Sequence, residues 1–362
     1  MTPAPPFAAR PGAPPGDTAH GRLAAHLRSR LGAERVSTDP LRNAALGGDA
    51  SAYHLVPQVV VDVADEADVV VVLAAAAAHA TPVTFRAAGT SLSGQGVTDS
   101  VLVRVRRGFE TLEPAADGRT VRLGAGVVGS HANLALAPFH RRIGPDPASL
   151  HVACVGGIVA NNASGMCCGP GQDAFHTLRA LRAVLADGTV VDTHDAAGRR
   201  ELALARPDLL DTLGALGRRV RGDAALAARI RAKHRIKNTM GYALLALTEF
   251  EDPIEIAQRL LVGSEGTLAF VSEVTLATVP DPPHRACALA LFPDLVTACA
   301  AAGMLDPERT AAAELMDRAS LRAVAGMPGV PAELGSLPSA AAALLVEVRA
   351  DSPPGLAADV AR

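Results

Sequence analysis

The chain has 362 residues, of which 49% are hydrophobic and 20% are charged, and its formal net charge at pH 7 is -3. The length exceeds one average domain, and the composition is that of a globular protein with ample material for a core. The slight negative charge argues against a nucleic-acid-binding protein, which would usually present a basic face. The five cysteines form no CxxC pair, so neither a disulfide framework nor a metal site is expected.

The N-terminal stretch MTPAPPFAARPGAPPGD is rich in Pro, Ala and Gly and lacks the apolar segment of a signal peptide. It predicts a disordered tail over residues 1–19. Residues 20–55 are interpreted as a helix with leucine spacing followed by a connector. The apolar run over 69–80 is about 12 residues long, too short to cross a bilayer. No transmembrane segment is expected, and the protein is predicted to be cytoplasmic or docked peripherally on the inner membrane.

The next part of the chain predicts strands at 58–63 and 82–87, separated by a helix that Asp65 caps, and hence a β–α–β unit. Further strands are expected at 101–105 and 120–126, with an Asp-Gly turn at 117–118 between them. A helix is expected from residue 129 and a hairpin around an Asp-Gly turn at 187–188. A charged helical region covers 199–232. A helix, a glycine turn and an alternating strand then lead to Pro280. Beyond residues 280–284, two strand–helix units predict a second, smaller domain.

Three segments consist largely of small residues, at 88–96, 156–165 and 263–267, and each is interpreted as a loop that follows a strand. Successive backbone N–H groups in such loops form concavities for anions, and Ser and Thr hydroxyls add donors. Three such segments in one expected domain indicate a single long ligand that passes several loops. A dinucleotide with a pyrophosphate fits this geometry.

The stretch GAGVVG at 124–129 matches GxGxxG and offers a different dinucleotide site, for NAD. A Rossmann site also requires an acidic residue about 20 positions further on. Asp146 is near that spacing, but Pro145 and Pro147 flank it and exclude an interior strand. The NAD site is therefore the minor alternative. The sequence contains no P-loop, no GxSxG elbow and no HExxH pair, so phosphate-loop, serine-hydrolase and zincin chemistry are not expected.

Five stretches together resemble the FAD-binding domain of the vanillyl-alcohol oxidase type, the PCMH flavoprotein fold. They are PVTFRAAGTSLSGQGVTDSVLV, GPDPASLHVACVGGIVANNASGMCCG, HTLRALRAVLADGTVVDT, RIKNTMGYALLAL and LLVGSEGTLAFVSEVTLATV. The closest resemblance is to the FAD-linked D-lactate / D-2-hydroxyglutarate dehydrogenase branch, and within it to long bacterial members with a C-terminal iron–sulfur domain. The resemblance implies an α+β fold. An FAD-binding domain of two α/β subdomains would cover 56–281, and the start of an α/β cap domain, truncated, would cover 282–362.

The resemblance also implies which residues bind FAD. The first segment, which would wrap the pyrophosphate, contributes Ala88, Gly89, Thr90, Ser91, Leu92, Ser93, Gly94 and Gln95. Pro145, Asp146 and Ser149 lead into the second segment, where the flavin would be lined by Gly156, Gly157, Asn161, Asn162, Ser164 and Gly165. The third segment would close on the cofactor with Val262, Gly263, Ser264, Glu265 and Gly266.

Some members of this family attach FAD covalently through a His that follows the paired small residues of the first segment. Thr90 stands at the matching position and cannot form that bond. The second known attachment residue, a Cys, would fall near Leu150, and Cys154 does not match it. Non-covalent FAD is therefore expected.

The reaction implied by the resemblance is oxidation of a D-2-hydroxy acid, D-lactate or D-2-hydroxyglutarate, by hydride transfer to the flavin. The electrons would pass to a quinone, a cytochrome or an iron–sulfur relay. The family's catalytic base and divalent metal come from an HxGDGNxH-like motif, which this sequence lacks together with any Cys-rich segment. No catalytic residue is assigned, and the alternative is a catalytically incomplete FAD-binding fragment or module of a longer iron–sulfur flavoprotein. Arg318 is the substrate-side candidate, with a solvated helix charge as its alternative.

Overall fold

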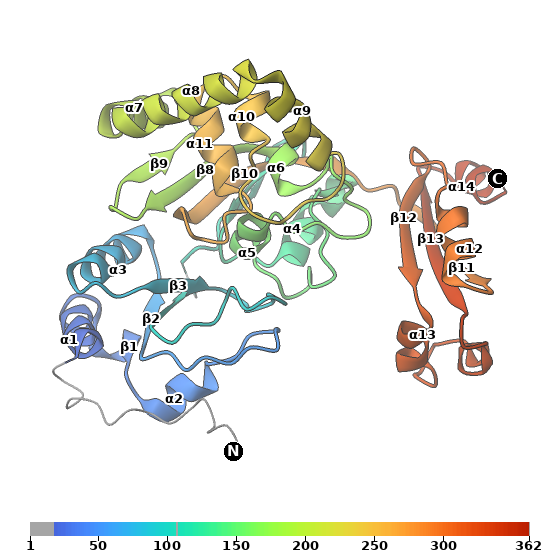
Figure 1. Cartoon of the computed structure of the whole chain (residues 1–362), viewed down its shortest axis with the longest axis horizontal. Helices are drawn as coiled ribbons and strands as arrows, with labels where there is room; N and C mark the ends of the chain where they lie inside the picture. Colours follow the sequence, from blue (N-terminus) through green and yellow to red (C-terminus); the bar gives the residue numbers. More distant parts are fainter. Residues whose placement is uncertain (1–17, 106–107, 362) are drawn as a thin grey trace.

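The computed structural model describes residues 18–105 and 108–361, so the expected disordered tail lies outside the described residues as far as residue 17. Within the described ranges the chain forms three sheets, and Figure 1 shows the third standing apart from the other two. The expected α+β class, with two adjoining α/β parts and a further unit, is confirmed.

The first sheet has four strands in the order β1-β2-β4-β3, and the last three are parallel. The expected β–α–β unit is present, but β4 pairs between its two strands. The elements of this part are α1 (Ala19–Leu31), η1 (Ala33–Arg35), β1 (Val36–Ser37), α2 (Pro40–Ala45), β2 (Val59–Val63), α3 (Glu66–Ala78), β3 (Val83–Arg86) and β4 (Val101–Val105).

The two central strands, β2 and β4, consist mainly of valine and are almost fully buried. β-branched side chains suit strands that are covered on both faces. The helix α3 begins where expected, because the Asp65 side chain accepts a hydrogen bond from the Asp68 backbone N–H at 2.9 Å. Parallel strands connected in this way bring their carboxyl ends to one edge of the sheet, where ligands commonly bind in α/β folds.

The second sheet is antiparallel and is organised around the long strand β10, which pairs with β6 and β8 and, at its end, with β7. Helices α8 to α11 pack on one another beside it (Figure 1). Its elements are β5 (Leu112–Pro114), β6 (Thr120–Gly124), α4 (Gly129–Leu136), η2 (Ala137–Phe139), β7 (Arg141–Ile143), α5 (Val155–Asn161), α6 (Ala174–Thr177), β8 (Leu178–Leu185), β9 (Val190–Asp192), α7 (Ala196–Ala205), α8 (Pro207–Gly222), α9 (Ala224–Lys233), α10 (Ala246–Glu249), α11 (Pro253–Leu261) and β10 (Ala269–Pro280).

Strands of the first and second sheets contribute to one hydrophobic cluster, and the second sheet and its helices enclose another. The Phe270 ring of β10 lies 4.8 Å from the Phe85 ring of β3 and 5.3 Å from the Phe109 ring, centroid to centroid. Val184 of β8 joins the same cluster as the valines of β2 and α3. This packing holds the loops at the ends of both sheets at fixed positions relative to one another.

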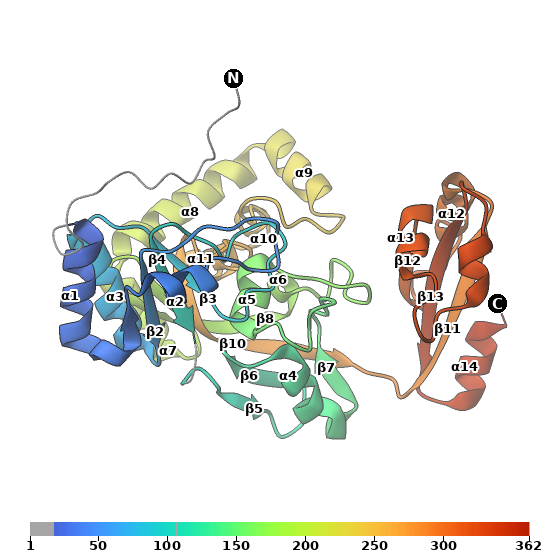
Figure 2. The same ribbon diagram turned by 90° about the horizontal axis from the view of Figure 1, so that it is seen from below.

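The third sheet has the order β11-β13-β12 and is entirely antiparallel. Figure 2 shows it joined to the rest of the chain through the link between β10 and β11. Both expected strand–helix units are present, and β12 and α13 lie between them. The elements are β11 (His284–Phe292), α12 (Leu295–Ala302), β12 (Thr310–Met316), α13 (Arg318–Val324), η3 (Ala332–Ser336), β13 (Ala342–Ala350) and α14 (Pro353–Val360).

The charged helical region expected over 199–232 is confirmed and consists of most of the three helices α7, α8 and α9. Two other expectations about local structure need correction. The Asp-Gly turn at 117–118 joins β5 to β6, because the short strand β5 intervenes after β4. Of the three small-residue segments, only 88–96 follows a strand: residues 156–161 belong to α5, and 263–267 follows α11.

Candidate functional site

The three small-residue segments meet at the side chain of Glu265. Its Oε1 accepts a hydrogen bond from Asn161 Nδ2 at 2.6 Å and another from Gln95 Nε2 at 3.4 Å. Gln95 belongs to the first segment and Asn161 to the second, so one carboxylate connects all three. The fold thus brings together stretches of chain that lie up to 170 positions apart.

The first segment leaves β3 and exposes its backbone. Gly89 and Gly94 have φ values of +71° and +81°, which residues other than Gly rarely adopt. Within the described part of the chain, no group accepts a hydrogen bond from the backbone N–H groups of Gly89, Thr90, Ser91 and Leu92. Unpaired N–H groups in such a turn are suited to bind an anion.

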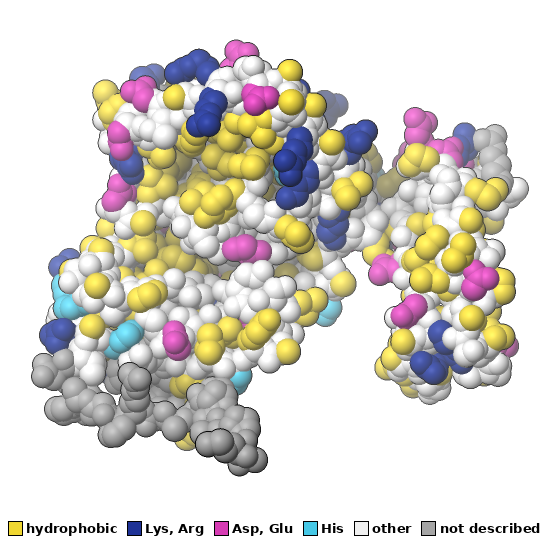
Figure 3. Space-filling model, viewed as in Figure 1, with side chains coloured by type: hydrophobic (Ala, Val, Ile, Leu, Met, Phe, Trp, Pro, Cys, Tyr) yellow, Lys and Arg dark blue, Asp and Glu magenta, His cyan; other side chains and the backbone are white. Residues whose placement is uncertain are grey.

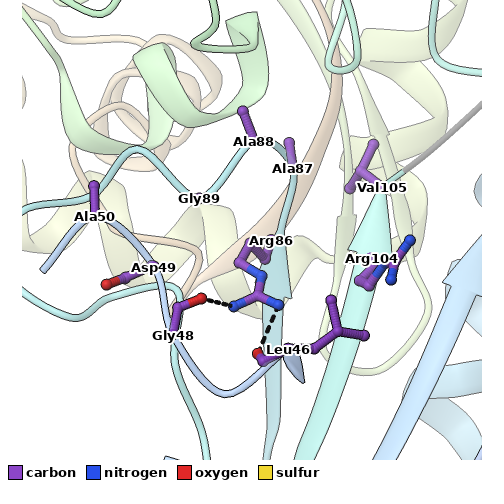
Figure 4. A pocket seen from close by; sticks show the side chains of 10 residues that line it. All are labelled: Leu46, Gly48, Asp49, Ala50, Arg86, Ala87, Ala88, Gly89, Arg104 and Val105. Carbon is purple, nitrogen blue, oxygen red and sulfur yellow. Dashed lines mark hydrogen bonds between the residues drawn. The ribbon is translucent and has the colours of Figure 1, made fainter. Parts of the chain in front are cut away.

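A pocket of about 580 Å³ opens beside this segment, at the carboxyl ends of β3 and β4. Figure 4 shows the residues that line it, which come from the strand ends and from the connector before β2. They are Leu46, Gly48, Asp49, Ala50, Arg86, Ala87, Ala88, Gly89, Arg104 and Val105.

The second segment depends on glycines that pack against backbone. A Cβ on Gly165 would lie 1.4 Å from the Asp146 carbonyl oxygen, and one on Gly156 would lie 2.8 Å from Ala125 Cβ. Asp146 also accepts a hydrogen bond from the Cys167 backbone at 3.3 Å. Gly157 differs, because a Cβ there would meet no atom within 4 Å. The structure therefore fills the space beside two of these glycines with protein and leaves the space beside Gly157 open.

The two adjacent asparagines of the second segment have different surroundings. Asn162 is buried at a φ of +52°, and its side chain donates to Asp173 and accepts from the Phe175 backbone, each at 3.0 Å. Those partners use its polar atoms for internal contacts. Asn161 instead points to Glu265. Asn161 is therefore the one of the pair that faces the other two segments.

The third segment is fixed by its own hydrogen bonds. Ser264 Oγ donates to the Leu261 carbonyl at 2.9 Å, and the backbone N–H groups of Gly263 and Glu265 donate to α5 carbonyls at 3.0 and 2.9 Å. Glu265 has a φ of +54°, a left-handed conformation that costs free energy for a residue with a side chain. Burial raises the pKa of its carboxyl group, and the hydrogen bond from Asn161 opposes that rise. Val262 is fully buried, and Gly266 has open space around it.

The remaining expected residues lead into the second segment. Pro145 is buried and lies two residues after the end of β7, and the Ser149 carbonyl accepts hydrogen bonds from the backbone of Val152 and Ala153 at 2.8 and 2.7 Å. Ser164 has its carbonyl oxygen 2.7 Å from Lys237 Nζ.

The segment after α9, within RIKNTMGYALLAL, lies across the second and third small-residue segments. Lys237 donates to Ser164, and the Tyr242 hydroxyl lies 2.9 Å from Thr267 Oγ1. Figure 3 shows Lys and Arg side chains gathered near α9 on the outer surface. The motif is visible in the sequence, but its contacts depend on the folded chain.

Arg318 begins α13 in the third sheet's unit. Its guanidinium donates to the carbonyls of Leu334 and Gly335 at 3.0 and 3.1 Å and so joins α13 to η3. A substrate-side role for it stays a prediction. No sequence motif points to Arg349 of β13, which pairs with Asp281 at 3.0 Å and donates to Cys167 Sγ at 3.2 Å. Arg349 thus connects the third sheet's unit to Cys167, two residues after the second segment.

Cys167 and Cys168 are expected to resist alkylation in the folded protein. Burial is the main cause that raises their thiol pKa values, to about 11 and about 12, so the reactive thiolate is scarce at pH 8. Cys287 and Cys299 are exposed and should be modified first. Peptide mapping after brief iodoacetamide treatment measures this. Equal labelling of Cys167 and Cys299 in the folded state would contradict it, and complete labelling in urea is the control.

Within the described residues, no three His, Cys, Asp or Glu side chains are placed to hold a metal ion. None of the described helices is long and apolar enough to cross a membrane. The residues of the three segments and the pocket fit a dinucleotide. Unpaired backbone donors, an open pocket at the ends of parallel strands and free space beside Gly157 offer room and hydrogen bonds to an elongated, anionic, flat-ringed ligand.

Comparison with protein families agrees with this geometry. Residues 57–194 match the family model described as FAD binding domain, and residues 281–361 match the model described as FAD linked oxidases, C-terminal domain. The first match contains the first two small-residue segments. The second begins in the link between β10 and β11.

Two curated relatives indicate the range of similarity. A D-2-hydroxyglutarate dehydrogenase of Pantoea ananatis is 34% identical over 257 residues, which are 67% of this chain and 24% of that protein. A D-lactate dehydrogenase of Archaeoglobus fulgidus is 29% identical over 223 residues, which are 61% of this chain and 39% of that protein. The chain thus spans about a quarter of the first relative and less than half of the second.

Among solved structures, an alkyldihydroxyacetonephosphate synthase superposes with a TM-score of 0.63 over 94% of this chain and 57% of its own length. The sequence identity is 14%, so the similarity is one of fold.

Proposed function

The chain belongs to the FAD-linked oxidases, and from that premise we propose that it oxidises a D-2-hydroxy acid, D-lactate or D-2-hydroxyglutarate, with non-covalently bound FAD. The observation that carries the proposal is the meeting of three small-residue segments at Glu265, together with a pocket at the carboxyl ends of β3 and β4 that Ala88 and Gly89 of the first segment help to line. The names of the relatives support the class of substrate.

In this proposal the chain's own residues bind and orient the cofactor. The unpaired N–H groups from Gly89 to Leu92, with the hydroxyls of Thr90 and Ser93, would hold the pyrophosphate. The second and third segments would line the flavin, with Gly157 leaving room for it. When bound, FAD supplies the two-electron oxidation chemistry, and the protein supplies position and electrostatics. Thr90 has no atom that could form the family's covalent link, which supports reversible binding.

No described residue is assigned the role of base for the substrate hydroxyl. We propose the division of the chain at 281/282, with 56–281 holding the cofactor and 282–362 belonging to a cap domain, after an N-terminal helix and connector over 20–55. Because the chain spans a quarter of one relative and less than half of the other, the second candidate function is an FAD-binding module without turnover of its own. The electron acceptor would be a quinone, a cytochrome or an iron–sulfur relay.

The purified chain is expected to be yellow, with a flavin absorption spectrum, and to release all its FAD when denatured. Under anaerobic conditions D-lactate or D-2-hydroxyglutarate should bleach the flavin, while the L enantiomers should not. The measurement is absorbance during titration with each acid. A yellow protein that none of these acids bleaches would favour the module. A colourless protein that free FAD does not reconstitute would contradict both candidates.

A further inference from the structure

The connector before β2 forms one wall of the pocket beside the first segment. Leu46, Gly48, Asp49 and Ala50 face the strand ends across a space of about 580 Å³ (Figure 4). Nothing in their sequence resembles a cofactor motif. Contacts within the fold must therefore hold these four residues beside the pocket.

Arg86, the last residue of β3, supplies that cause. Its Nη1 donates to the Gly48 carbonyl at 2.8 Å and to the Gly96 carbonyl at 3.3 Å, and its Nη2 donates to the Leu46 carbonyl at 2.8 Å. The side chain is 9% exposed. A planar guanidinium can hold acceptors on two sides at once, which a lysine ammonium cannot do with the same geometry.

Further contacts join the connector to both ends of the first segment. The Ala50 backbone N–H donates to the Gly89 carbonyl at 2.9 Å, and the Gly96 N–H donates to Asp49 Oδ2 at 3.2 Å. A Cβ on Gly89 or Gly96 would lie 3.3 or 3.2 Å from Arg86 Cδ, so both glycines fit closely against this side chain.

The direction of these hydrogen bonds has an electrostatic consequence. Three carbonyl oxygens near an anion-binding loop would repel a pyrophosphate if they faced it. Arg86 donates to all three of these oxygens, whereas no described group accepts a hydrogen bond from the N–H groups of Gly89 to Leu92, so the donors of the first segment stay available to an anion. The Nη donors of Arg86 bind acceptors within the protein. Arg86 therefore affects a ligand by holding the loop in position.

We propose that Arg86 is a positioning residue of the cofactor pocket and that the segment from Leu46 to Ala50 is the pocket's second wall. This inference rests on the proposed function, because the ligand it serves is the pyrophosphate part of the dinucleotide. The alternative role for Arg86 is a charge contact with the phosphate.

The test compares Arg86→Lys and Arg86→Met with the unchanged chain by FAD titration, and it follows flavin fluorescence. If positioning matters, both variants bind FAD at least tenfold more weakly. The matched control is Arg221→Lys, because Arg221 of α8 also donates to two carbonyls, those of Leu247 and Phe250, but lies outside the pocket. It should bind FAD like the unchanged chain.

A second readout needs no cofactor. The chain has two Tyr and no Trp, so a Tyr242→Phe background leaves Tyr53 as the sole tyrosine. A Cβ on Gly94 would lie 2.7 Å from Tyr53 Cδ2, which shows that the ring rests on the first segment. Arg86→Lys in this background should increase quenching of Tyr53 emission by iodide, because the connector detaches from the segment.

The outcomes separate the two proposals. An unchanged chain that binds no FAD overturns the proposed function and this inference with it. If the unchanged chain binds FAD and Arg86→Lys binds it equally well, only the inference is overturned. If Arg86→Lys binds FAD normally and only Arg86→Met binds it weakly, Arg86 makes a charge contact with the phosphate. If Arg86→Lys does not fold, Asp49→Ala tests the same wall with Arg86 in place, and unaltered FAD affinity in that variant overturns the inference.

Discussion

Gly165→Ala is expected to lower the free energy of unfolding of the FAD-free chain by about 1–3 kcal/mol, the usual cost of overpacking. The added Cβ would lie 1.4 Å from the Asp146 carbonyl oxygen, far inside contact distance. The obstacle is backbone, so no side-chain rotation can relieve it, and the segment from Pro145 to Ser149 must shift. Urea unfolding followed by circular dichroism measures the difference.

Gly157→Ala is the matched control from the same segment. A Cβ there meets no atom within 4 Å, and the residue lies inside α5. Exchange of Gly for Ala within a helix is favourable by about 0.5–1 kcal/mol, so the FAD-free variant should be at least as stable as the unchanged chain. The same methyl group would enter space that we assign to the cofactor, so FAD affinity should fall. Equal destabilisation by the two variants would contradict the packing described for Gly165.

Glu265→Ala is expected to weaken FAD binding by about ten- to a hundredfold. Hydrogen bonds to a charged acceptor contribute about 1.5–3 kcal/mol, and 1.4 kcal/mol corresponds to a factor of ten. The variant loses the bonds from Asn161 and Gln95, so the three segments are no longer connected through one side chain. FAD titration of the purified variant measures the loss.

Glu265→Gln is the control for this variant, and it adds a pH dependence. Its amide oxygen still accepts hydrogen bonds, so FAD affinity should fall less than in the alanine variant. Burial raises the pKa of the Glu265 carboxyl above its ordinary value of 4.5. The folded state therefore holds this proton more tightly, and the carboxyl's contribution to stability is present below pH 4.5 and is lost as the pH rises through the raised pKa.

The glutamine variant does not titrate at this position, so its free energy of unfolding should fall less than that of the unchanged chain between pH 4 and pH 8. Urea unfolding at several pH values measures this. Identical pH profiles for the two proteins would show that the Glu265 carboxyl is not held in a buried state.

Much of the local structure was predictable from short stretches of sequence. Asp65 caps α3, and Gly188 closes the β8–β9 hairpin with a φ of +85°, both as expected. These features depend on neighbours within a few residues, where side-chain preference and backbone sterics act directly. The position of α5 was missed. Gly156 and Gly157 are typical of a loop, yet both lie in α5, where Gly156 packs against Ala125 and donates its backbone N–H to the Ala125 carbonyl at 2.9 Å.

The sequence by itself determined the chemistry of the three small-residue segments, namely their small side chains and their hydroxyls. It also determined the family, because the five motifs that carry the resemblance are continuous stretches of sequence in a fixed order. Only the tertiary structure decided which of these residues meet. Gln95 reaches Glu265, and Arg86 reaches Leu46, across long stretches of chain. Such contacts depend on the order and register of the strands, and in this fold β4 lies between β2 and β3. This strand order depends on how the whole hydrophobic core is buried. No short stretch of the sequence specifies it.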